Sequence, residues 1–582
     1  MRIVRNNNYY NKMSHSLFMI ICTLITGVLI LIYLLHDYDS HFRFSAKSGF
    51  YDDSFELKIL GNKDYDVYYT IDGSEPTTSS TKYTEPILIS DRTPEPNEYS
   101  NRYDISTGYY SDEIAAYSYS EGDPGYVLPQ YAVDKCTVVR ASIFDEEGER
   151  VNEISGVYFV GSEKKEKYDD IMIVSIATAP NNLFDYYDGI YVTGEDFDDY
   201  LWLCDKVGYD QFWWSSYWSM WPANYRLRGI KSEREARIDI FDNHQNLILS
   251  QTSGIRVQGD GSRGKLPRNL KIFSREEYSG SRYFQTDVFG NKNDLHKYVL
   301  FGGADDNIYK IKDYLANTME SELNFATMDF KPCVCFLEGE YWGTYYLTEY
   351  YDKDYIQSHY DVPRNDVVIW KEGEISEGKK YDIKLYSDME SFISKNDMSI
   401  KENYEKACEL IDINSFIDYY AAQIFIGRAG DWPGGNEAAW RSKNASINSK
   451  YRDGKWRWML FDVNSTGLDL TGVDDDTITS TEKNSRLFAS LIQNESFKRQ
   501  FCERMIYIEN NIYSEENIEK FINKYYEEML TPLCWSNQRY YGDERKDEII
   551  SNAEDVKSFL LERRKYIDKS IREHFGEEYL EQ

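Results

Sequence analysis

Three polar residues in the second half of the chain have the types and spacing of a phosphoryl-transfer site. Asp431 is followed five residues later by Asn436, and Asp462 comes at the end of an apolar run that begins at Trp456. In kinases one carboxylate orients the attacking hydroxyl group and takes its proton, while an Asn and a second carboxylate hold magnesium against the phosphates. Magnesium prefers such hard oxygen ligands. Asp431 is therefore a candidate catalytic residue, and Asn436 and Asp462 are candidate metal ligands.

The same residues also fit a purely structural interpretation. Trp432-Pro433-Gly434-Gly435 is a typical turn sequence, in which Asp431 would cap a helix and Asn436 would tolerate a left-handed backbone. The spacing alone favours this turn, so other segments of the chain have to decide between the two interpretations.

A Gly-rich segment, residues 254–275, offers a candidate phosphate-binding site. A strand is expected to run into the turn at residues 259–262 and to return as a basic strand. Backbone amides freed by glycines, with cations beside them, suit a polyphosphate, although a hairpin with a solvated basic rim would look similar. Positive charge is unexpected here, since the chain's formal net charge is −33. The candidate phosphate-contacting residues are Arg256, Ser262, Arg263, Arg268 and Lys271.

Two further candidates for nucleotide binding lie at the ends of expected strands. Glu349 follows a hairpin predicted over residues 333–349, and it could orient a phosphate-binding cation as the Lys–Glu pair of kinases does. As a charge at the start of the next helix it would need no such role. Lys371 ends an apolar strand at residues 367–371, which could line a nucleotide pocket.

Length and composition restrict the function classes. The 582 residues are enough for two or more domains. The 99 acidic against 66 basic residues exclude a nucleic-acid binder, because such a surface repels phosphate backbones. An aromatic content of 16% argues against disorder and would also allow stacking on sugars. The eight cysteines show no zinc-binding spacing, and we infer no disulfide framework.

The N-terminal region has the pattern of a membrane anchor. Residues 17–35 are apolar or small and are just long enough to cross a bilayer. Arg2, Arg5 and Lys12 precede them, so the positive-inside rule places residues 1–16 in the cytoplasm and the rest of the chain outside. A cleaved signal peptide is the alternative, but no small-x-small cleavage site follows directly. A signal anchor in the cell membrane is therefore favoured.

The remaining segments predict an α+β fold. Alternating strands at residues 65–71, 137–144 and 157–160 indicate a small antiparallel β-sandwich over residues 46–162. An acidic, Tyr-rich insertion at 91–133 lacks periodicity and is expected to form an irregular surface loop. Residues 168–480 mix buried strands with helices, and residues 481–582 are predicted to form amphipathic helices.

Two regions resemble known families. Residues 68–77, YYTIDGSEPT, followed by KYTEPI at 82–87, resemble the chitobiase/β-hexosaminidase C-terminal module, an accessory sandwich without catalysis of its own. Residues 168–480 resemble the CotH (spore coat protein H) atypical kinases. The motifs that carry this second resemblance are Gly254-Ile255-Arg256, Lys312-Asp313, residues 337–343, residues 431–436 and residues 455–458.

The CotH resemblance implies a protein-kinase-like fold that binds ATP with Mg²⁺ or Mn²⁺ and phosphorylates proteins. It implies a catalytic role for Asp431 and metal binding by Asn436 and Asp462. Two positions depart from the family pattern: Arg268 stands where a Lys is usual, and Asn464 stands where a second Asp is frequent. Arg is a fixed fork rather than a point charge. Asn464 can still offer an oxygen to a metal, but it carries no charge.

These observations lead to one main hypothesis and two alternatives. The main hypothesis is a membrane-anchored kinase that transfers the γ-phosphate of ATP to Ser or Thr of a cell-surface or spore-coat protein. The first alternative is a catalytically weak kinase fold that binds glycans or proteins at the cell surface; Arg268 and Asn464 favour it. A glycoside hydrolase is less well supported, because the sequence specifies no pair of carboxylates across a sugar-binding cleft.

Overall fold

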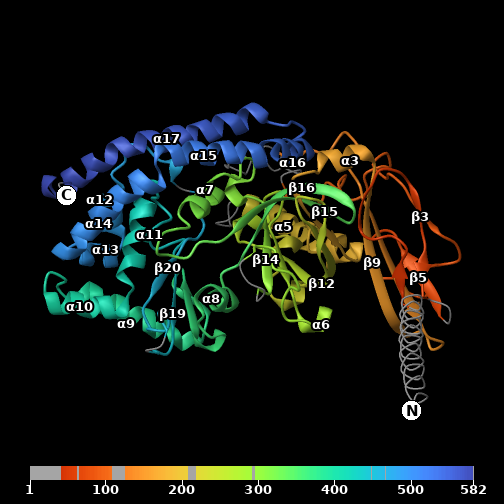
Figure 1. Ribbon diagram of the computed structural model, residues 1–582, viewed down its shortest axis with the longest axis horizontal. Helices are drawn as coiled ribbons and strands as arrows, with labels where there is room; N and C mark the ends of the chain where they lie inside the picture. Colours follow the sequence, from red (N-terminus) through yellow and green to blue (C-terminus); the bar gives the residue numbers. More distant parts are fainter. Residues whose placement is uncertain are drawn as a thin grey trace, which may run out of the picture. The chain divides into compact units, whose positions relative to one another are not determined.

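The computed structural model describes residues 41–61, 65–107, 125–207, 218–290, 295–446, 449–465 and 467–580 (Figure 1). The membrane span predicted at residues 17–35 lies outside these ranges. Across the part of the chain that is described, no helix combines the length and the apolar character needed to cross a membrane. The chain divides into two compact units, one formed by residues 1–92 and 136–166 and the other by residues 93–135 and 167–582.

The first unit is a β-sandwich. Its larger sheet has the strand order β2-β9-β8-β5-β6, and the pairs β3-β7 and β1-β4 complete it. Apolar side chains of both layers, such as Leu57, Ile89 and Val139, share one core. The strands are β1 (Arg43–Phe44), β2 (Gly49–Tyr51), β3 (Phe55–Leu57), β4 (Ile59–Leu60), β5 (Asp66–Thr70), β6 (Thr81–Lys82), β7 (Ile87–Ile89), β8 (Thr137–Phe144) and β9 (Arg150–Val160).

One strand of the sandwich departs from the expected antiparallel arrangement. β2 pairs in parallel with β9, whereas β5 and β9 both pair antiparallel to β8. β2 takes an edge position beside the last strand of the unit, so two strands far apart in sequence run in the same direction. The expectation of a purely antiparallel sheet is therefore wrong at this edge.

The insertion within the sandwich packs into the second unit. Its described parts, residues 93–107 and 125–135, contain no α-helix or β-strand, yet Tyr99, Ile105 and Tyr126 are buried in the same cluster as the adjacent barrel. The Glu340 carboxylate accepts hydrogen bonds from the backbone amides of residues 98, 99 and 100, at 2.7, 3.2 and 2.7 Å. The segment is irregular, as expected, but these side chains belong to a core rather than to a surface loop.

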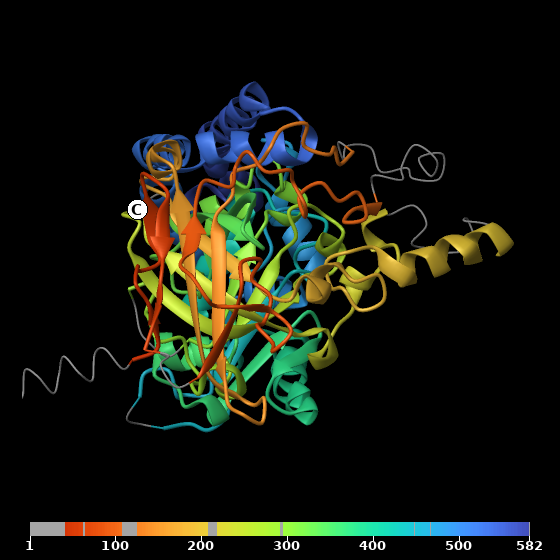
Figure 2. The ribbon, with the colours of Figure 1, turned by 90° about the vertical axis from the view of Figure 1, so that its right-hand side faces the viewer.

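The second unit contains a closed barrel of seven strands in the order β10-β11-β12-β13-β14-β16-β15. β10 and β15 are parallel, and the other neighbours are antiparallel. The helix α5 (Gly194–Val207) stands away from the barrel in Figure 2. The barrel strands are β10 (Met172–Ala177), β11 (Arg234–Phe241), β12 (Leu247–Val257), β13 (Leu270–Phe273), β14 (Lys297–Phe301), β15 (Phe330–Leu337) and β16 (Glu340–Thr348).

A four-stranded antiparallel sheet, β18-β17-β19-β20, follows the barrel. α11 (Ile413–Phe425) is buried on almost every side, which explains why most of its residues are apolar or aromatic. The Ser415 hydroxyl accepts a hydrogen bond from the Trp458 amide and so joins this helix to β20. The other elements are α7 (Lys312–Met319), α8 (Lys353–Tyr360), α9 (Ile383–Lys395), α10 (Lys401–Leu410), β17 (Val367–Lys371), β18 (Glu374–Glu377), β19 (Ala438–Ser442) and β20 (Arg457–Met459).

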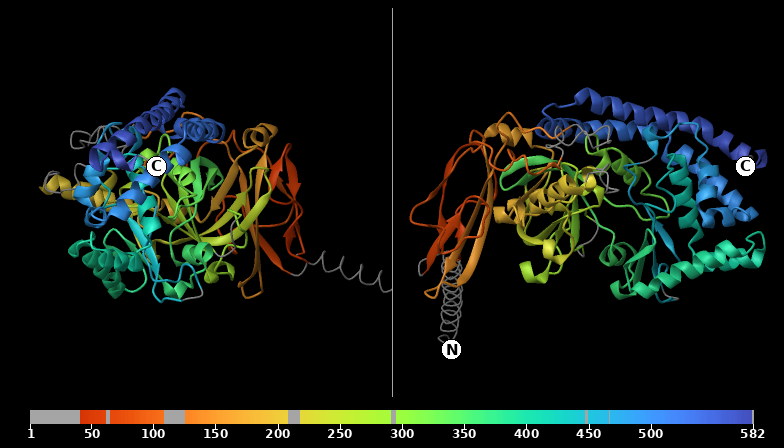
Figure 3. Two further views of the ribbon diagram at one scale, coloured as in Figure 1. Left: turned by 60° about the vertical axis from the view of Figure 1, so that its left-hand side comes forward. Right: turned by 180° about the vertical axis from the view of Figure 1, so that it is seen from behind.

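The C-terminal helices hold the end of α11. They share its hydrophobic core, and the buried Arg563 donates hydrogen bonds to the carbonyl oxygens of Ile424 and Phe425 at 3.3 and 3.2 Å. A cation at a helix C-terminus is favourable. The helices are α12 (Thr477–Asn484), α13 (Arg486–Leu491), α14 (Glu495–Tyr507), α15 (Glu515–Tyr525), α16 (Thr531–Tyr541) and α17 (Lys546–His574), the last of which runs beside α15 in Figure 3.

Burial of Glu320 predicts that the stability of the protein depends on pH. Its carboxyl group bonds with the Tyr513 hydroxyl and the Gln423 amide, and burial raises its pKa to about 7. A raised folded-state pKa gives stability that is complete below the unfolded pKa and is lost as the pH rises through 7. We expect the stability of Glu320→Gln, relative to the native protein, to rise by up to about 3 kcal/mol between pH 4.5 and 8.5.

Urea unfolding followed at several pH values checks this expectation. Glu322→Gln is the matched control, because Glu322 is exposed two residues away. Parallel pH profiles for the native protein and Glu320→Gln would contradict the assignment.

Candidate functional site

Asp431 lies in the loop that follows α11. Gly427 and Gly430 have φ values of 75° and 94°, in the left-handed region that favours glycine, and they turn the chain out of the helix. The buried Trp432 then anchors the loop, since its indole N–H donates to the Tyr419 hydroxyl at 3.1 Å. Asp431 is thus held between a glycine-containing turn and a fixed aromatic side chain.

The carboxylate of Asp431 is positioned by two hydrogen bonds and remains accessible. Its Oδ2 accepts from the Asn436 amide at 2.6 Å and from the Ser465 hydroxyl at 3.0 Å. Its Oδ1 lies 3.7 Å from the Arg428 guanidinium, and the side chain is 26% exposed. An oriented, partly exposed carboxylate of this kind can accept a proton from an incoming hydroxyl group.

Asp462 lies beside a second carboxylate, Asp313, which begins α7. The Asn464 amide donates to Asp462 Oδ1 at 2.5 Å and to Asp313 Oδ2 at 2.8 Å. Asp313 also accepts from the Val463 amide at 3.0 Å. Burial raises the pKa of both carboxyl groups, and the charge of Asp313 raises that of Asp462 further. The charge of Arg428 acts in the opposite direction on both carboxyl groups but does not cancel the effect of burial.

Arg428 connects the two halves of the site. It is buried, and its guanidinium donates to the carbonyl oxygens of Phe461 and Asp462 at 3.2 and 2.7 Å. A third hydrogen bond goes to the Gln423 side chain at 3.2 Å. One cation therefore fixes the segment that carries Asp462 and lies within 4 Å of Asp431.

Two lysines, on β13 and β17, lie against aromatic rings, and Lys371 Nζ also lies 3.8 Å from the neighbouring Glu372 carboxylate. Lys371 Nζ lies 3.7 Å from the centre of the Phe461 ring, and burial lowers its pKa. Lys271 Nζ lies 3.5 Å from the centre of the Tyr350 ring. Burial, with smaller contributions from Lys297 and other cations, lowers the Lys271 pKa well below its ordinary value. Both ammonium groups would gain from an anion.

The other candidates in the Gly-rich segment hold the fold together. Arg256 lies 3.4 Å from the Glu233 carboxylate, which also binds Arg275. Arg263 donates to backbone carbonyl oxygens, including that of Gly259 at 2.7 Å. Ser262 lies in the short 3₁₀ turn at residues 261–263. The partners of Arg256 and Arg263 are therefore groups of the protein itself.

Arg268 and Glu349 also have partners that differ from those expected. The Arg268 guanidinium is buried 3.9 Å from the centre of the Tyr225 ring and 4.9 Å from that of Tyr191. Glu349 hydrogen-bonds with His359 at 2.6 Å and accepts from the Asp329 amide at 3.0 Å. The structure therefore does not place Glu349 in a Lys–Glu pair with Lys271.

Three contributors, Asp313, Arg428 and Ser465, were not assigned roles from the sequence. Asp313 accepts a hydrogen bond from the Val463 amide, which lies 150 residues later in the chain, and no local sequence pattern predicts a contact over that separation. For Arg428, the sequence indicates a role in the site only through its position three residues before Asp431, the candidate catalytic residue. Asn464, expected to bind metal, instead uses its amide nitrogen to hold two carboxylates.

A second group of potential metal ligands is already compensated by cations. His296, Asp352 and Asp354 offer ligand atoms within 4.8 Å of one another. Lys297 lies 2.9 Å from Asp352, and Arg364 lies 2.5 Å from Asp354, which is also 3.3 Å from Arg282. His296 and nearby arginines lower the pKa of Asp354. This cluster is therefore an ion-pair network rather than a metal centre.

Comparison with known families agrees with this architecture. Residues 255–567, more than half of the chain, match the model of the CotH kinase protein family. Residues 46–94 match the chitobiase/beta-hexosaminidase C-terminal domain. No curated protein is significantly similar to the chain. The family match spans the barrel from its third strand, the loop of Asp431, the segment of Asp462 and most of the C-terminal helices. The chain belongs to the CotH kinase protein family.

Proposed function

We propose that the protein is a metal-dependent kinase that transfers the γ-phosphate of ATP to Ser or Thr hydroxyl groups of a protein. One observation carries this proposal. The fold brings Asp431, with its bound Asn436, and the Asp462–Asp313 pair around a single buried cation, Arg428. Phosphoryl transfer requires such a combination of an oriented base and adjacent hard oxygen ligands.

The charges near the site fit magnesium ATP. Burial raises the pKa of Asp462 and Asp313 and lowers the pKa of Lys371 and Lys271, so the charged form of each group is destabilised. A divalent ion would compensate the carboxylates, and a triphosphate would compensate the lysines. Asp462 and Asn436 are the side chains that would hold Mg²⁺ or Mn²⁺, and bound metal would neutralise charge on the phosphates.

The residues of the chain then have distinct tasks. Asp431 would orient an acceptor hydroxyl and take its proton, while Asn436 and Ser465 hold Oδ2 and the Arg428 guanidinium lies 3.7 Å from Oδ1. Lys371 is the cation best placed for a phosphate, because it lies close enough to Asp462 for that carboxylate to raise its pKa. Asn464 keeps Asp462 and Asp313 together. The departure at Arg268 places a buried guanidinium between the rings of Tyr191 and Tyr225, and none of its nitrogen atoms has a hydrogen-bond partner among the described residues.

Asp462→Asn should abolish the dependence of ATP binding on metal. Removing one carboxylate charge weakens the attraction for Mg²⁺ while the shape of the side chain is kept. We expect ATP affinity of the full chain to rise at least tenfold with Mg²⁺ or Mn²⁺ in the native protein and to be insensitive to metal in the variant. Isothermal titration calorimetry measures both.

Asp474→Asn provides the matched control, because Asp474 is an exposed carboxylate on the same segment of the chain. No ATP binding by the native protein at millimolar concentration with either metal would refute the proposed nucleotide site.

Asp431→Asn should lose phosphoryl transfer and keep ATP binding. Loss of a general base lowers kcat by about 10²–10⁴-fold without removing a ligand of the nucleotide. The measurement is incorporation of labelled γ-phosphate into the chain itself and into casein, with phosphorylated residues located by mass spectrometry. ATP binding by the native protein without any transfer would favour the alternative of a catalytically weak kinase fold that acts by binding.

We further propose that residues 17–35 anchor the protein in the cell membrane, with residues 1–16 inside and the chain after the span outside. The apolar length and the preceding basic residues support this proposal. The full chain should then stay in the membrane pellet after alkaline carbonate extraction. The variant Leu24→Arg/Leu29→Arg should be released, because each Arg at the centre of a span costs about 2.5–3.5 kcal/mol. Release of the native chain by carbonate would exclude the anchor.

A further inference from the structure

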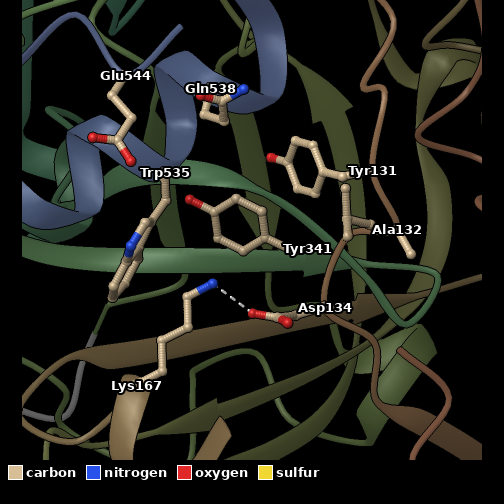
Figure 4. A pocket seen from close by; sticks show the side chains of 9 residues that line it. Tyr131, Ala132, Asp134, Lys167, Tyr341, Trp535, Gln538 and Glu544 are labelled. Atoms are coloured by element: carbon tan, nitrogen blue, oxygen red, sulfur yellow. Dashed lines mark hydrogen bonds and ion pairs between the residues drawn. The ribbon is translucent and has the colours of Figure 1, made fainter. Parts of the chain in front are cut away.

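A cavity of about 190 Å³ opens in the second unit, away from the residues assigned to phosphoryl transfer. Its walls come from the end of the insertion, the start of β16 and α16, and Figure 4 shows how the side chains surround it. The volume is smaller than that of typical drug-binding pockets and suits a ligand of about one ring. The lining residues are Tyr131, Ala132, Val133, Asp134, Lys167, Tyr341, Trp535, Gln538 and Glu544.

The positive charge at the cavity is already neutralised. Lys167 Nζ lies 2.7 Å from the Asp134 carboxylate, which also accepts from the Tyr168 hydroxyl at 2.6 Å. The same ammonium lies 4.8 Å from the centre of the Trp535 ring and 5.9 Å from that of Tyr341. Lys167 thus occupies the place that an external cation would take among these aromatic rings.

Several polar groups around the cavity have no hydrogen-bond partner in the part of the chain that the structure describes. Within the described residues, no hydrogen bond uses the Tyr131 hydroxyl, the Trp535 indole N–H or the Glu544 carboxylate. Figure 4 shows the hydroxyl groups of Tyr131 and Tyr341 on the side of their rings that faces Trp535. Burial raises the pKa of Tyr131, so its hydroxyl keeps its proton and can donate. Donors and acceptors therefore stand beside aromatic faces.

This combination excludes three ligand classes. An anion would meet Asp134 and Glu544 and would find Lys167 already paired. A cation would compete with Lys167 for the same rings. A wholly apolar ligand would desolvate the ion pair and the free polar groups without replacing their hydrogen bonds. A neutral ring with hydroxyl groups at its edge and C–H groups on its faces satisfies both the aromatic and the polar parts of the wall.

We propose that this cavity binds one neutral pyranose unit of a glycan. The ring of the sugar packs against Trp535 and the tyrosines, and its hydroxyl groups bond with Glu544, Tyr131 and the Asp134–Lys167 pair. The site shares no residue with the proposed nucleotide site, so it does not depend on kinase activity. A single sugar in a small pocket binds with a dissociation constant on the order of millimolar.

Saturation-transfer NMR of the full chain with glucose, galactose and N-acetylglucosamine tests the proposal. At least one of these sugars should give a signal in the native protein that weakens about tenfold or more in Trp535→Ala. Glu544→Gln provides a second test with little risk to folding, since Glu544 is exposed, and it should weaken binding several-fold. Trp202→Ala is the matched control, because Trp202 is a 63% exposed Trp of α5 in the same unit.

The competing outcomes are distinguishable. Absence of signal for all three sugars at tens of millimolar, or signals equal in the native protein, Trp535→Ala and Glu544→Gln, would overturn the proposal. Displacement of the sugar by choline or inorganic phosphate would also overturn it, because it would show an ionic site. ATP titration of the same variants should match the native protein, which separates a failure here from a failure of the nucleotide site.

Discussion

The candidate active site depends on one buried guanidinium. Arg428 binds the backbone of Phe461 and Asp462 and lies beside Asp431, so it joins the loop after α11 to the segment after β20. A buried charge is tolerated only when its hydrogen bonds are made, and loss of one partner of such a network typically costs about 3–5 kcal/mol. Both segments must therefore be in place together, and neither carboxylate can be positioned independently of the other.

The charges around Arg428 are arranged for binding rather than for stability. Carboxylates gather at Asp313 and Asp462, and ammonium groups gather at Lys271 and Lys371, each without full compensation. Surplus charges of both kinds destabilise the free protein and are typical of functional sites. The rest of the unit offsets this cost through an extensive aromatic core and through Arg563, which secures the end of α11 from the C-terminal helices.

Local sequence patterns predicted the elements better than the contacts between them. The predicted strands at residues 137–144 and 367–371 coincide with β8 and β17, because short runs of β-branched and aromatic residues leave strong patterns. The family resemblance, carried by short motifs, was confirmed. The partners of Arg256, Arg268 and Glu349 were not predictable, since each depends on a residue from a distant strand or loop. Charge type alone does not show whether an arginine faces a ligand or a tyrosine.

The interrupted sandwich has a consequence for the order in which the protein is made. Residues 93–135 leave the ribosome before the groups that bury them: Ser100 bonds with Glu340 across 240 residues, and Tyr126 bonds with Arg539 across 413. The strands of the sandwich are complete by residue 160, so the first unit can fold while its insertion still exposes Tyr99 and Ile105. Nascent chains that stop short of β16 lack Glu340 and the last strand of the barrel, so they carry this apolar segment before the core that buries it is complete.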